Sequence, residues 1–357
     1  MKILRLYYLL PPKIGGMEKH IYNLSKFQTK DHNIHIMFNY GNKVNFSDIK
    51  VLPFIKLYKI KPSSIGIILF YISVIFKLKN IKKTFDIIHI HGDWSSLLFV
   101  KTLKKLTNAK LVVLTLHDQL TPKYTHQKLL PKLVQNVDLI FSTGYDTAKE
   151  LEKLSGKKII VQPSGINDMF FEKFHKNFEN ETFTIITVAN LFPKKNLELV
   201  LEIAKELKNY KFLIVGDGSE RKNLENKIKN ENIPNVELLG FKNTEEVKKY
   251  YQNSDVYLLT SLAEGTPTSA LEAMACGLPV VSSNAGGLEN IVKDNINGFI
   301  INDFDKYKYI EKIKLLEDIN LRQKIFENNI KLSQKYKWEN VAKNITEIMR
   351  TKLNEKN

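Results

Sequence analysis

Apolar and polar stretches alternate along the chain in a rhythm that predicts strands separated by helices. Short apolar runs are typical of buried parallel strands. They lie at residues 3–9, 33–38, 50–53, 86–91, 110–116, 137–142, 158–162, 183–189, 212–215, 236–241 and 256–259. Longer segments between them repeat apolar residues at helical spacing, as in 197–207. Strands separated by helices throughout imply parallel sheets flanked by helices, an α/β fold.

The stretch 256–282 predicts a strand, a turn, a helix, a second turn and a further strand. After the apolar run 256–259, Thr266 is expected to be the N-cap of the helix, with Pro267 at the first helical position. Gly277 follows the last turn and can adopt the left-handed backbone conformation that ends a helix.

Two carboxylates bracket this turn, Glu264 in the loop after the strand and Glu272 in the second turn of the helix. A helix start presents free N–H groups and a positive dipole end, which suit a phosphate. Open α/β sheets bind ligands at the carboxyl ends of their strands. Carboxylates beside a phosphate are placed to accept hydrogen bonds from the ribose and hexose hydroxyls of a nucleotide sugar. The alternative is that Glu264 caps a loop and Glu272 is a solvated helix residue.

Length and composition fit a protein of two ordinary domains, with 357 residues and 43% hydrophobic content. The single cysteine, Cys276, excludes an intramolecular disulfide and a multi-cysteine metal site, which fits a reducing compartment. The most apolar stretch, 65–76, is shorter than the roughly 20 residues that span a membrane. We therefore expect a cytoplasmic protein without a signal peptide or a spanning helix.

The formal net charge of +16 favours anionic partners such as nucleotide diphosphates or acidic lipids. The basic residues are scattered and not interleaved with aromatic residues, which argues against a nucleic-acid-binding protein. The apolar helix predicted at 63–83 is flanked by lysines at both ends. Two interpretations stay open for this helix: peripheral contact with an anionic membrane, or a crossover helix buried against the sheet.

The segment EGTPTSALEAMACGLPVVSS, residues 264–283, resembles the E-x7-E signature of the retaining nucleotide-sugar glycosyltransferases of family 4, also called group 1. The resemblance extends over nearly the whole chain. It implies a GT-B type fold of two facing Rossmann-like domains with a cleft between them. The implied domains are an acceptor-side domain at 1–165, with the helix 338–357 packing back on it, and a donor-binding domain at 166–337.

The same resemblance implies roles for single residues in the first domain. Gly15 and Gly16 match the family's glycine loop, which contacts the donor diphosphate. His117, at the end of a predicted strand, matches a histidine that contacts the donor sugar near the reacting carbon. Glu18 and His20 follow the glycine loop, and they either face the cleft or belong to a solvated helix face.

In the second domain, residues 189–196 align with the family pattern G-R-L-x-x-x-K-G. Lys195 matches the phosphate-binding lysine, but Asn190 occupies the slot of the arginine, and Lys194 is a candidate replacement charge. The resemblance assigns donor binding to the E-x7-E segment as well. Its implied donor-binding residues there are Gly265, Thr266, Pro267, Thr268 and Glu272, with Glu264 as a catalytic residue.

The implied activity is transfer of a hexose-type sugar from a nucleotide-diphosphate donor to a hydroxyl acceptor, with retained anomeric configuration. We expect no cofactor and no metal, because lysines and helix N–H groups supply the positive charge. The acceptor is expected to be a saccharide or lipid-linked saccharide of surface polysaccharide or glycolipid synthesis. Two alternatives are a nucleotide-sugar 2-epimerase on the same fold and a non-catalytic donor-binding partner of another transferase.

Overall fold

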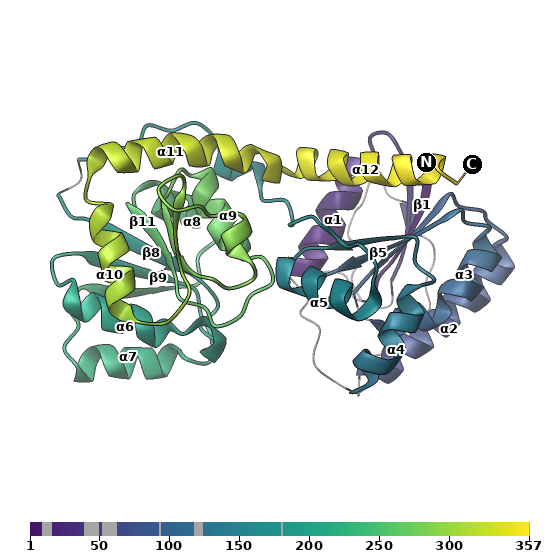
Figure 1. Cartoon of the computed structure of the whole chain (residues 1–357), viewed down its shortest axis with the longest axis horizontal. Coiled ribbons are helices and arrows are strands. Elements are labelled where there is room, and N and C mark those ends of the chain that lie inside the picture. The colour runs from purple at the N-terminus through teal and green to yellow at the C-terminus, as the bar shows by residue number, and fades with distance from the viewer. Residues whose placement is uncertain are drawn as a thin grey trace. The chain divides into compact units, whose positions relative to one another are not determined.

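The computed structural model describes residues 1–8, 16–38, 50–51, 63–92, 94–117, 124–179 and 181–356. The chain divides into two compact units: unit 1 is Met1–Gly165 with Trp338–Asn357, and unit 2 is Ile166–Lys337. Each unit is a parallel sheet with helices on both faces (Figure 1). The predicted α/β class, with two Rossmann-like domains, is confirmed.

Unit 1 holds a seven-stranded sheet in the order β3-β2-β1-β4-β5-β6-β7. Its strands are β1 (Lys2–Leu6), β2 (Asn33–Met37), β3 (Lys50–Val51), β4 (Ile87–His91), β5 (Leu111–Leu116), β6 (Leu139–Ser142) and β7 (Ile160–Val161). Its helices are α1 (Gly16–Gln28), α2 (Ser63–Ile81), the 3-10 helix η1 (Trp94–Phe99), α3 (Val100–Thr107), α4 (Tyr124–Val134), α5 (Tyr145–Ser155) and α12 (Trp338–Asn354).

Side chains of this sheet alternate between two apolar layers, as the geometry of a strand requires. On β5, Leu111 and Val113 belong to the layer with α1 and α12, and Val112 and Leu114 belong to the layer with α2 to α5. Every residue of β5 is buried. The continuous apolar runs of the sequence are therefore explained by burial on both faces.

The last helix, α12, belongs to unit 1 although it follows unit 2 in the chain. Val341, Ile345 and Met349 recur at helical spacing and are buried against α1 and the sheet. At its start, the ring of Trp338 lies over Gly165, where an added Cβ would meet Trp338 Cδ2 at 2.4 Å. Only a glycine fits beneath this ring.

Unit 2 holds a six-stranded sheet in the order β10-β9-β8-β11-β12-β13. Its strands are β8 (Thr184–Val188), β9 (Lys211–Val215), β10 (Val236–Gly240), β11 (Val256–Leu259), β12 (Val280–Ser283) and β13 (Gly298–Ile301). Its α-helices are α6 (Leu197–Glu206), α7 (Arg221–Asn230), α8 (Thr244–Gln252), α9 (Thr268–Ala275), α10 (Lys306–Leu315) and α11 (Ile319–Ser333). Its 3-10 helices are η2 (Asp168–Phe171), η3 (Pro193–Lys195), η4 (Leu288–Asn290) and η5 (Gln334–Tyr336).

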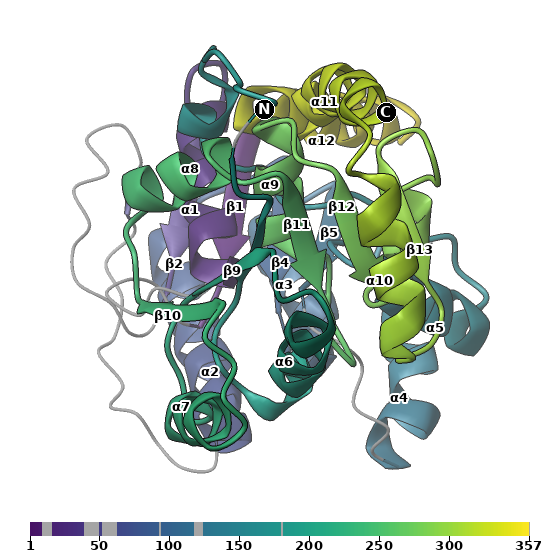
Figure 2. The ribbon, with the colours of Figure 1, turned by 90° about the vertical axis from the view of Figure 1, so that its left-hand side faces the viewer.

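The helices of unit 2 cover both faces of its sheet. Figure 2 shows α8 and α9 on the opposite side of the sheet from α6 and α7. One core cluster joins α6, α7 and α10 to alternate strand residues such as Ile185, Phe212 and Leu258. The short helix α9 contacts the sheet at β11 and β12 and also contacts α11 and η2.

Helix α2 packs one face on the sheet, as a crossover helix does, through Phe70, Tyr71, Val74 and Leu78. Another face of the same helix carries exposed apolar side chains. These are Ile65, Ile68, Ile72 and Phe76, which are 48%, 36%, 38% and 62% exposed. Among the described residues, no helix is both long enough and apolar enough to span a membrane.

Candidate functional site

The strand order of each sheet contains a crossover point. In unit 2 the chain adds β9 and β10 on one side of β8 and then β11 to β13 on the other side. Open α/β sheets bind ligands at such a point, beyond the carboxyl ends of the strands. The loops that follow β8 and β11 meet there, and they carry Lys195 and Glu264.

Lys195 and Glu264 form an ion pair across this point. Lys195 Nζ donates to Glu264 Oε1, and Ser261 Oγ donates to the same oxygen at 2.7 Å. The two side chains are only 13% and 9% exposed. A carboxylate withdrawn this far from water needs both a counter-charge and hydrogen bonds. The pair therefore links the two loops and holds a carboxylate and an ammonium at the edge of the sheet.

Backbone contacts fix the same two loops. Thr260 Oγ1 donates to the carbonyl oxygens of Lys195 and Asn196 at 3.1 and 3.0 Å, and the Leu262 N–H donates to the Lys194 carbonyl at 2.8 Å. Asn196 adopts a left-handed backbone conformation with φ of 50°, which turns η3 into α6. Lys195 is thus positioned by its backbone as well as by its ion pair.

The loop after β12 packs directly on the loop of Glu264. Gly286 has φ of +66°, and an added Cβ would lie 1.9 Å from the Gly265 carbonyl oxygen and 3.0 Å from Glu264 Cβ. Both the left-handed backbone and this close approach require glycine. The Gly286 turn therefore supports the backbone of Glu264 and Gly265 from one side.

Helix α9 starts one residue later than predicted. Pro267 is its N-cap with an extended backbone (φ −69°, ψ 105°), and the Pro267 carbonyl accepts from the Ala270 N–H at 3.1 Å. The prediction that Thr266 is the N-cap and Pro267 the first helical residue is therefore wrong, because ψ at Pro267 is not helical. Thr268, which is exposed, begins the helix.

The remainder of the segment lies as predicted. Glu272 is in the second turn of α9 and partly exposed. Gly277 ends the helix with φ of +79°, and its N–H donates to the Met274 carbonyl at 2.9 Å. Gly265 and Thr266 are partly exposed in the loop, and Pro267 is buried.

The loop with Asn190, the residue in the arginine slot of the family pattern, lies against the turn after β9. An added Cβ on Gly216 would meet the Ala189 carbonyl oxygen at 1.9 Å, and one on Gly218 would meet the Leu191 carbonyl oxygen at 2.4 Å. Asn190 itself is exposed, as is Lys194. The backbone of the loop is therefore held tightly, while both side chains face solvent.

In unit 1 the crossover lies between β1 and β4, and histidines gather at the carboxyl ends of the strands there. His91 ends β4, His117 follows β5, and His20 lies on α1, the helix after β1. His91 Nδ1 lies 3.1 Å from His117 Nε2, and the rings of His20 and His117 are 4.7 Å apart. We call His20, His91 and His117 the histidine cluster.

A buried polar row continues from the histidine cluster beneath α1. Arg5, His89 and Thr115 occupy positions that face α1 on β1, β4 and β5. Arg5 Nη2 donates to Gln28 Oε1 at 2.6 Å and lies 3.4 Å from His89 Nδ1, while His89 Nε2 lies 2.7 Å from Thr115 Oγ1. Burial lowers the pKa of Arg5 to about 9.

Burial also depresses the pKa of the cluster histidines. It lowers the pKa of His117 to about 3. The pKa of His20 and that of His91 lie well below the ordinary value, mainly through burial and then through neighbouring histidines and Arg5. These imidazoles are therefore neutral at neutral pH and present lone pairs or N–H donors, not charge.

The glycine loop is only partly visible. Gly15 lies outside the described residues, and Gly16 is the exposed first residue of α1, where an added Cβ would meet no atom of a described residue within 4 Å. Glu18 and His20 are buried, at 7% and 1% exposure, and Tyr7 donates its hydroxyl to Glu18 at 3.2 Å. The alternative that Glu18 and His20 form a solvated helix face is wrong, because both pack against the sheet.

Two family models match the chain in succession. The model described as Glycosyltransferase Family 4 matches residues 14–169, and the model described as Glycosyl transferases group 1 matches residues 168–332. The chain belongs to this glycosyltransferase family. The family predicted from the E-x7-E segment is confirmed.

The chain is similar to individual glycosyltransferases over all or part of its length. An uncharacterized glycosyltransferase of Methanocaldococcus jannaschii is 27% identical over 361 aligned positions, which cover 98% of this chain and 97% of that protein. An N-acetyl-D-galactosaminyltransferase of Campylobacter jejuni is 32% identical over 178 positions, 48% of each chain. The solved structure of Anabaena HepE in complex with UDP and glucose superposes with a TM-score of 0.77 at 19% identity, covering 98% of this chain and 100% of that one. The GT-B type of fold is thereby confirmed.

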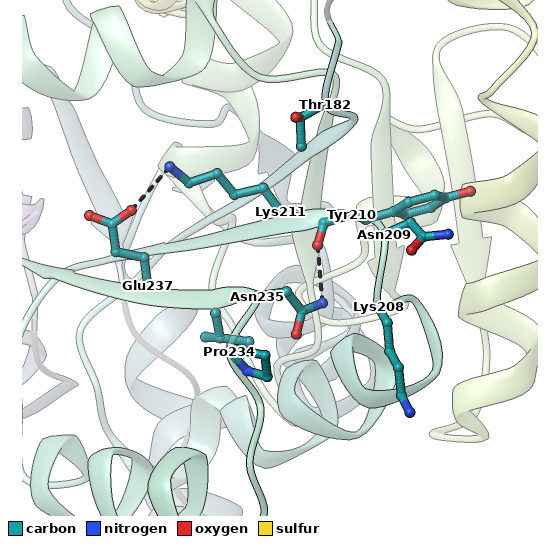
Figure 3. Close-up of a pocket in the computed structure, with 9 residues that line it drawn as sticks. Thr182, Lys208, Asn209, Tyr210, Lys211, Pro234, Asn235 and Glu237 are labelled. Carbon is teal, nitrogen blue, oxygen red and sulfur yellow. Dashed lines mark hydrogen bonds and ion pairs between the residues drawn. The ribbon is translucent and has the colours of Figure 1, made fainter.

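A surface depression of the glycosyltransferase lies away from these residues. It measures about 450 Å³ and is formed at the amino ends of β9 and β10 by residues 208–211 and 234–237 with Thr182 (Figure 3). Two pairs of its polar groups interact with each other: Lys211 contacts Glu237 at 3.1 Å, and Asn235 donates to the Tyr210 carbonyl at 3.0 Å. Because it opens at the end of the sheet opposite to the crossover loops, we assign it no part in the site.

Two features of the glycosyltransferase's site were not predicted from the sequence. The ion pair joins Lys195 to a glutamate that lies 69 positions along the chain, and the contact between His91 and His117 joins residues that are 26 positions apart. Neither spacing matches a local motif. The signal that could have indicated both contacts was the expected parallel order of the strands, since this order brings the carboxyl ends of neighbouring strands together.

Proposed function

We propose that this glycosyltransferase moves a hexose-type sugar from a nucleotide-diphosphate donor to a hydroxyl acceptor with retention of the anomeric configuration. One arrangement carries the proposal: Lys195 and Glu264 meet at the crossover point of unit 2, close in sequence to the first turn of α9. This sheet edge combines an ammonium, a carboxylate and the first N–H groups of a helix, which have no partner within the helix itself. These are the groups that bind phosphates and sugar hydroxyls.

In the proposed complex, Lys195 and the first N–H groups of α9 bind the diphosphate. Glu264 accepts hydrogen bonds from hydroxyls of the sugar, and Glu272, one turn further along α9, accepts them from the ribose. Gly265, Thr266, Pro267 and Thr268 form the loop that brings backbone N–H groups to the phosphates. In unit 1, Gly15 and Gly16 contribute to diphosphate binding and His117 contacts the sugar.

The proposed transfer breaks the bond between the anomeric carbon and the β-phosphate oxygen. The acceptor hydroxyl attacks the anomeric carbon from the same face, and its proton passes to the departing phosphate. Negative charge develops on that phosphate, where Lys195 and backbone N–H groups stabilise it. We propose that no divalent cation takes part, since these donors already supply positive charge.

The exposed Asn190 changes the donor site relative to the family pattern. An arginine in this slot offers two parallel N–H donors, whereas Asn190 offers neutral ones. The exposed Lys194 lies four residues further along the same loop, and we propose that its ammonium supplies the missing charge as a single point. The donor is then bound by two neighbouring lysines.

The nature of donor and acceptor is supported by the relatives. HepE, which shares the fold, was solved with UDP and glucose. The Campylobacter relative is named for its action on a saccharide linked to PP-undecaprenol. We propose a nucleotide-diphosphate hexose as donor, and as acceptor a saccharide or lipid-linked saccharide in surface polysaccharide or glycolipid synthesis.

The test is product analysis with nucleotide sugars and saccharide acceptors. We expect a new glycosidic bond whose anomeric coupling constant in NMR equals that of the donor. Glu264→Gln should lower kcat/KM by between about 10- and 150-fold, the value of a lost hydrogen bond to a charged group. The exposed Glu237→Gln, on β10, is the matched control and should keep full activity.

Other outcomes would contradict the proposal. An inverted anomeric configuration would refute retention. A new sugar epimer formed without any acceptor would identify the 2-epimerase instead. Donor binding without turnover, with pathway output undiminished by Glu264→Ala, would identify a non-catalytic partner of another transferase.

We also propose that unit 1 contacts an anionic membrane surface through α2. The exposed stripe of Ile65, Ile68, Ile72 and Phe76 follows the spacing of one helix face, and Lys77, Lys79, Lys82 and Lys83 follow it directly. Apolar side chains beside lysines suit the boundary between acyl chains and anionic headgroups. Such a contact would place the enzyme at the inner face of the membrane, where a lipid-linked acceptor is present.

Vesicle sedimentation tests this contact. We expect binding to phosphatidylglycerol vesicles, weaker binding at high salt and little binding to phosphatidylcholine vesicles. Phe76→Ser removes an apolar side chain worth roughly 1–2 kcal/mol of burial, so binding should weaken about tenfold. Phe241→Ser, which changes an 80% exposed phenylalanine of unit 2, is the control. Equal binding by both variants and the wild type would refute the proposal.

A further inference from the structure

The histidine cluster brings together three imidazoles from three different elements of unit 1. One ring nitrogen from each of His20, His91 and His117 lies within 4.8 Å of the other two. His20 and His91 are buried and His117 is partly exposed. The cluster is therefore enclosed on the side of α1 and accessible to solvent at His117.

Two of its nitrogen atoms have no hydrogen-bond partner among the described residues. His20 Nε2 and His91 Nε2 are buried and accept or donate no hydrogen bond. Leaving a buried polar atom unpaired costs about 1–3 kcal/mol. The third ring contributes Nε2 of His117, which shares the 3.1 Å contact with His91 Nδ1. One imidazole binds an ion through one nitrogen only, so His91 offers Nδ1 and its unpaired Nε2 is not a ligand atom. The unpaired His20 Nε2 is the atom for which the described residues supply no occupant.

A hydrogen bond on the second ring nitrogen orients the imidazole of His20. His20 Nδ1 lies 2.8 Å from Ser164 Oγ. Metal-binding histidines almost always engage their second ring nitrogen in this way, which leaves the first nitrogen free to coordinate. Ser164 thus fixes the His20 imidazole with Nε2 available.

We propose that His20, His91 and His117 bind one first-row transition-metal ion of the Zn²⁺ type. With metal–nitrogen bonds of about 2.0–2.1 Å, two ligands of a tetrahedral zinc ion lie roughly 3.3 Å apart. The distance of 3.1 Å between His91 Nδ1 and His117 Nε2 is close to this value. The ligand atom of His20 lies within 4.8 Å of those of the other two rings, so the proposed site requires a small shift of the His20 ring beside Ser164. Three imidazoles plus one open position is an established zinc geometry.

The chemistry of the cluster selects the ion. Imidazole nitrogen suits Zn²⁺, Co²⁺, Ni²⁺ and Cu²⁺, whereas Mg²⁺ and Ca²⁺ prefer carboxylate and carbonyl oxygens. No carboxylate belongs to the group of possible ligands found in the described part of the chain. The buried cation Arg5 hydrogen-bonds with Ser25, Gln28 and His89, not with the three ligands.

Metal binding would have a functional consequence that rests on the proposed function. A coordinated His117 imidazole cannot contact the donor sugar, so the ion acts as an inhibitor and not as a cofactor. We therefore expect transfer to fall as the metal site fills. Ser164→Ala should need a higher Zn²⁺ concentration for the same inhibition.

Cobalt titration tests the site without any need for activity. The full chain, without an affinity tag, is treated with EDTA, desalted and titrated with Co²⁺. We expect one ion per chain, the visible absorption of tetrahedral Co²⁺, and loss of that absorption when Zn²⁺ is added. His20→Gln and His91→Gln should weaken binding by more than about 100-fold, and Ser164→Ala by about 10- to 100-fold.

The matched control is His175→Gln, which removes an exposed histidine of unit 2 and should bind Co²⁺ like the wild type. Circular dichroism without metal checks that each variant folds, and if the histidine variants do not, Ser164→Ala decides. No cobalt absorption in the wild type would overturn the proposal, as would absorption that survives in Ser164→Ala and in both histidine variants with unchanged affinity. Nucleotide-sugar binding, measured separately, reports on the donor site alone.

Discussion

The ion pair between Lys195 and Glu264 predicts a measurable coupling between two loops of unit 2. The perturbations are Lys195→Met, Glu264→Gln and the double variant. Breaking a buried pair by removing one partner costs about 3–5 kcal/mol. Because these side chains keep 13% and 9% exposure, we expect about 2–4 kcal/mol for Lys195→Met. Ser261 still donates to the carboxylate in that variant, which limits the loss.

Glu264→Gln should cost less, about 1–2 kcal/mol, since the lysine side chain is long enough to turn its ammonium to water. In the double variant neither charge is left alone. Its loss should therefore be smaller than the sum of the single losses by about 1–3 kcal/mol.

Urea denaturation measures these values for unit 2 separately. Both tryptophans, Trp94 and Trp338, belong to unit 1, so tryptophan fluorescence follows that unit. Far-UV circular dichroism follows the unfolding of both units. A transition that circular dichroism shows and tryptophan fluorescence does not show therefore belongs to unit 2. If the two single losses simply add in the double variant, the pair does not couple the loops and our description of the site is refuted.

Three further predictions concern the same unit. Gly286→Ala should destabilise unit 2 by more than about 2 kcal/mol, because both the positive φ and the nearby Gly265 carbonyl oppose a Cβ. Gly156→Ala, in unit 1, also has a positive φ of +67° but open space around it, so it should cost only about 1 kcal/mol. The two losses are compared through the midpoints of urea denaturation. Burial lowers the pKa of Lys176 to about 8. Between pH 8 and the ordinary pKa of lysine, the unfolded state therefore binds more protons than the folded state, and the free energy of unfolding should rise by up to about 1.4 kcal/mol per pH unit. Lys176→Met should lack this contribution to the pH dependence. Asn190→Arg should tighten nucleotide-diphosphate binding about tenfold in calorimetry, and unchanged affinity would show that the slot does not contact the donor.

Strand and helix positions were largely predictable, because strands that are buried on both faces of a parallel sheet consist of continuous apolar runs. The strand 256–259 and the start of α6 at Leu197 lie where the pattern places them. The start of α9 was missed by one residue, because Pro267 suits both the N-cap and the first helical position. Local propensity does not separate these two.

The site was less predictable than the fold, for a physical reason. Single motifs identify Glu264, Glu272 and Lys195 as candidates, but the contact of Lys195 with Glu264 depends on the order of strands β8 and β11. The histidine cluster depends in the same way on β1, β4 and β5. Sequence spacing gives no sign of either, since helices and loops of variable length separate the strands.

The measurement that tests the central claim most directly is calorimetric binding of UDP-, GDP-, ADP- and dTDP-sugars to the wild type and to Glu272→Ala, with and without EDTA. We predict that one nucleotide class binds the wild type, that EDTA leaves its affinity unchanged, and that Glu272→Ala weakens it by about 10- to 150-fold through loss of a hydrogen bond to a charged group. Absence of binding by every donor, or equal binding by the variant, would contradict a nucleotide-sugar site at the crossover point of unit 2.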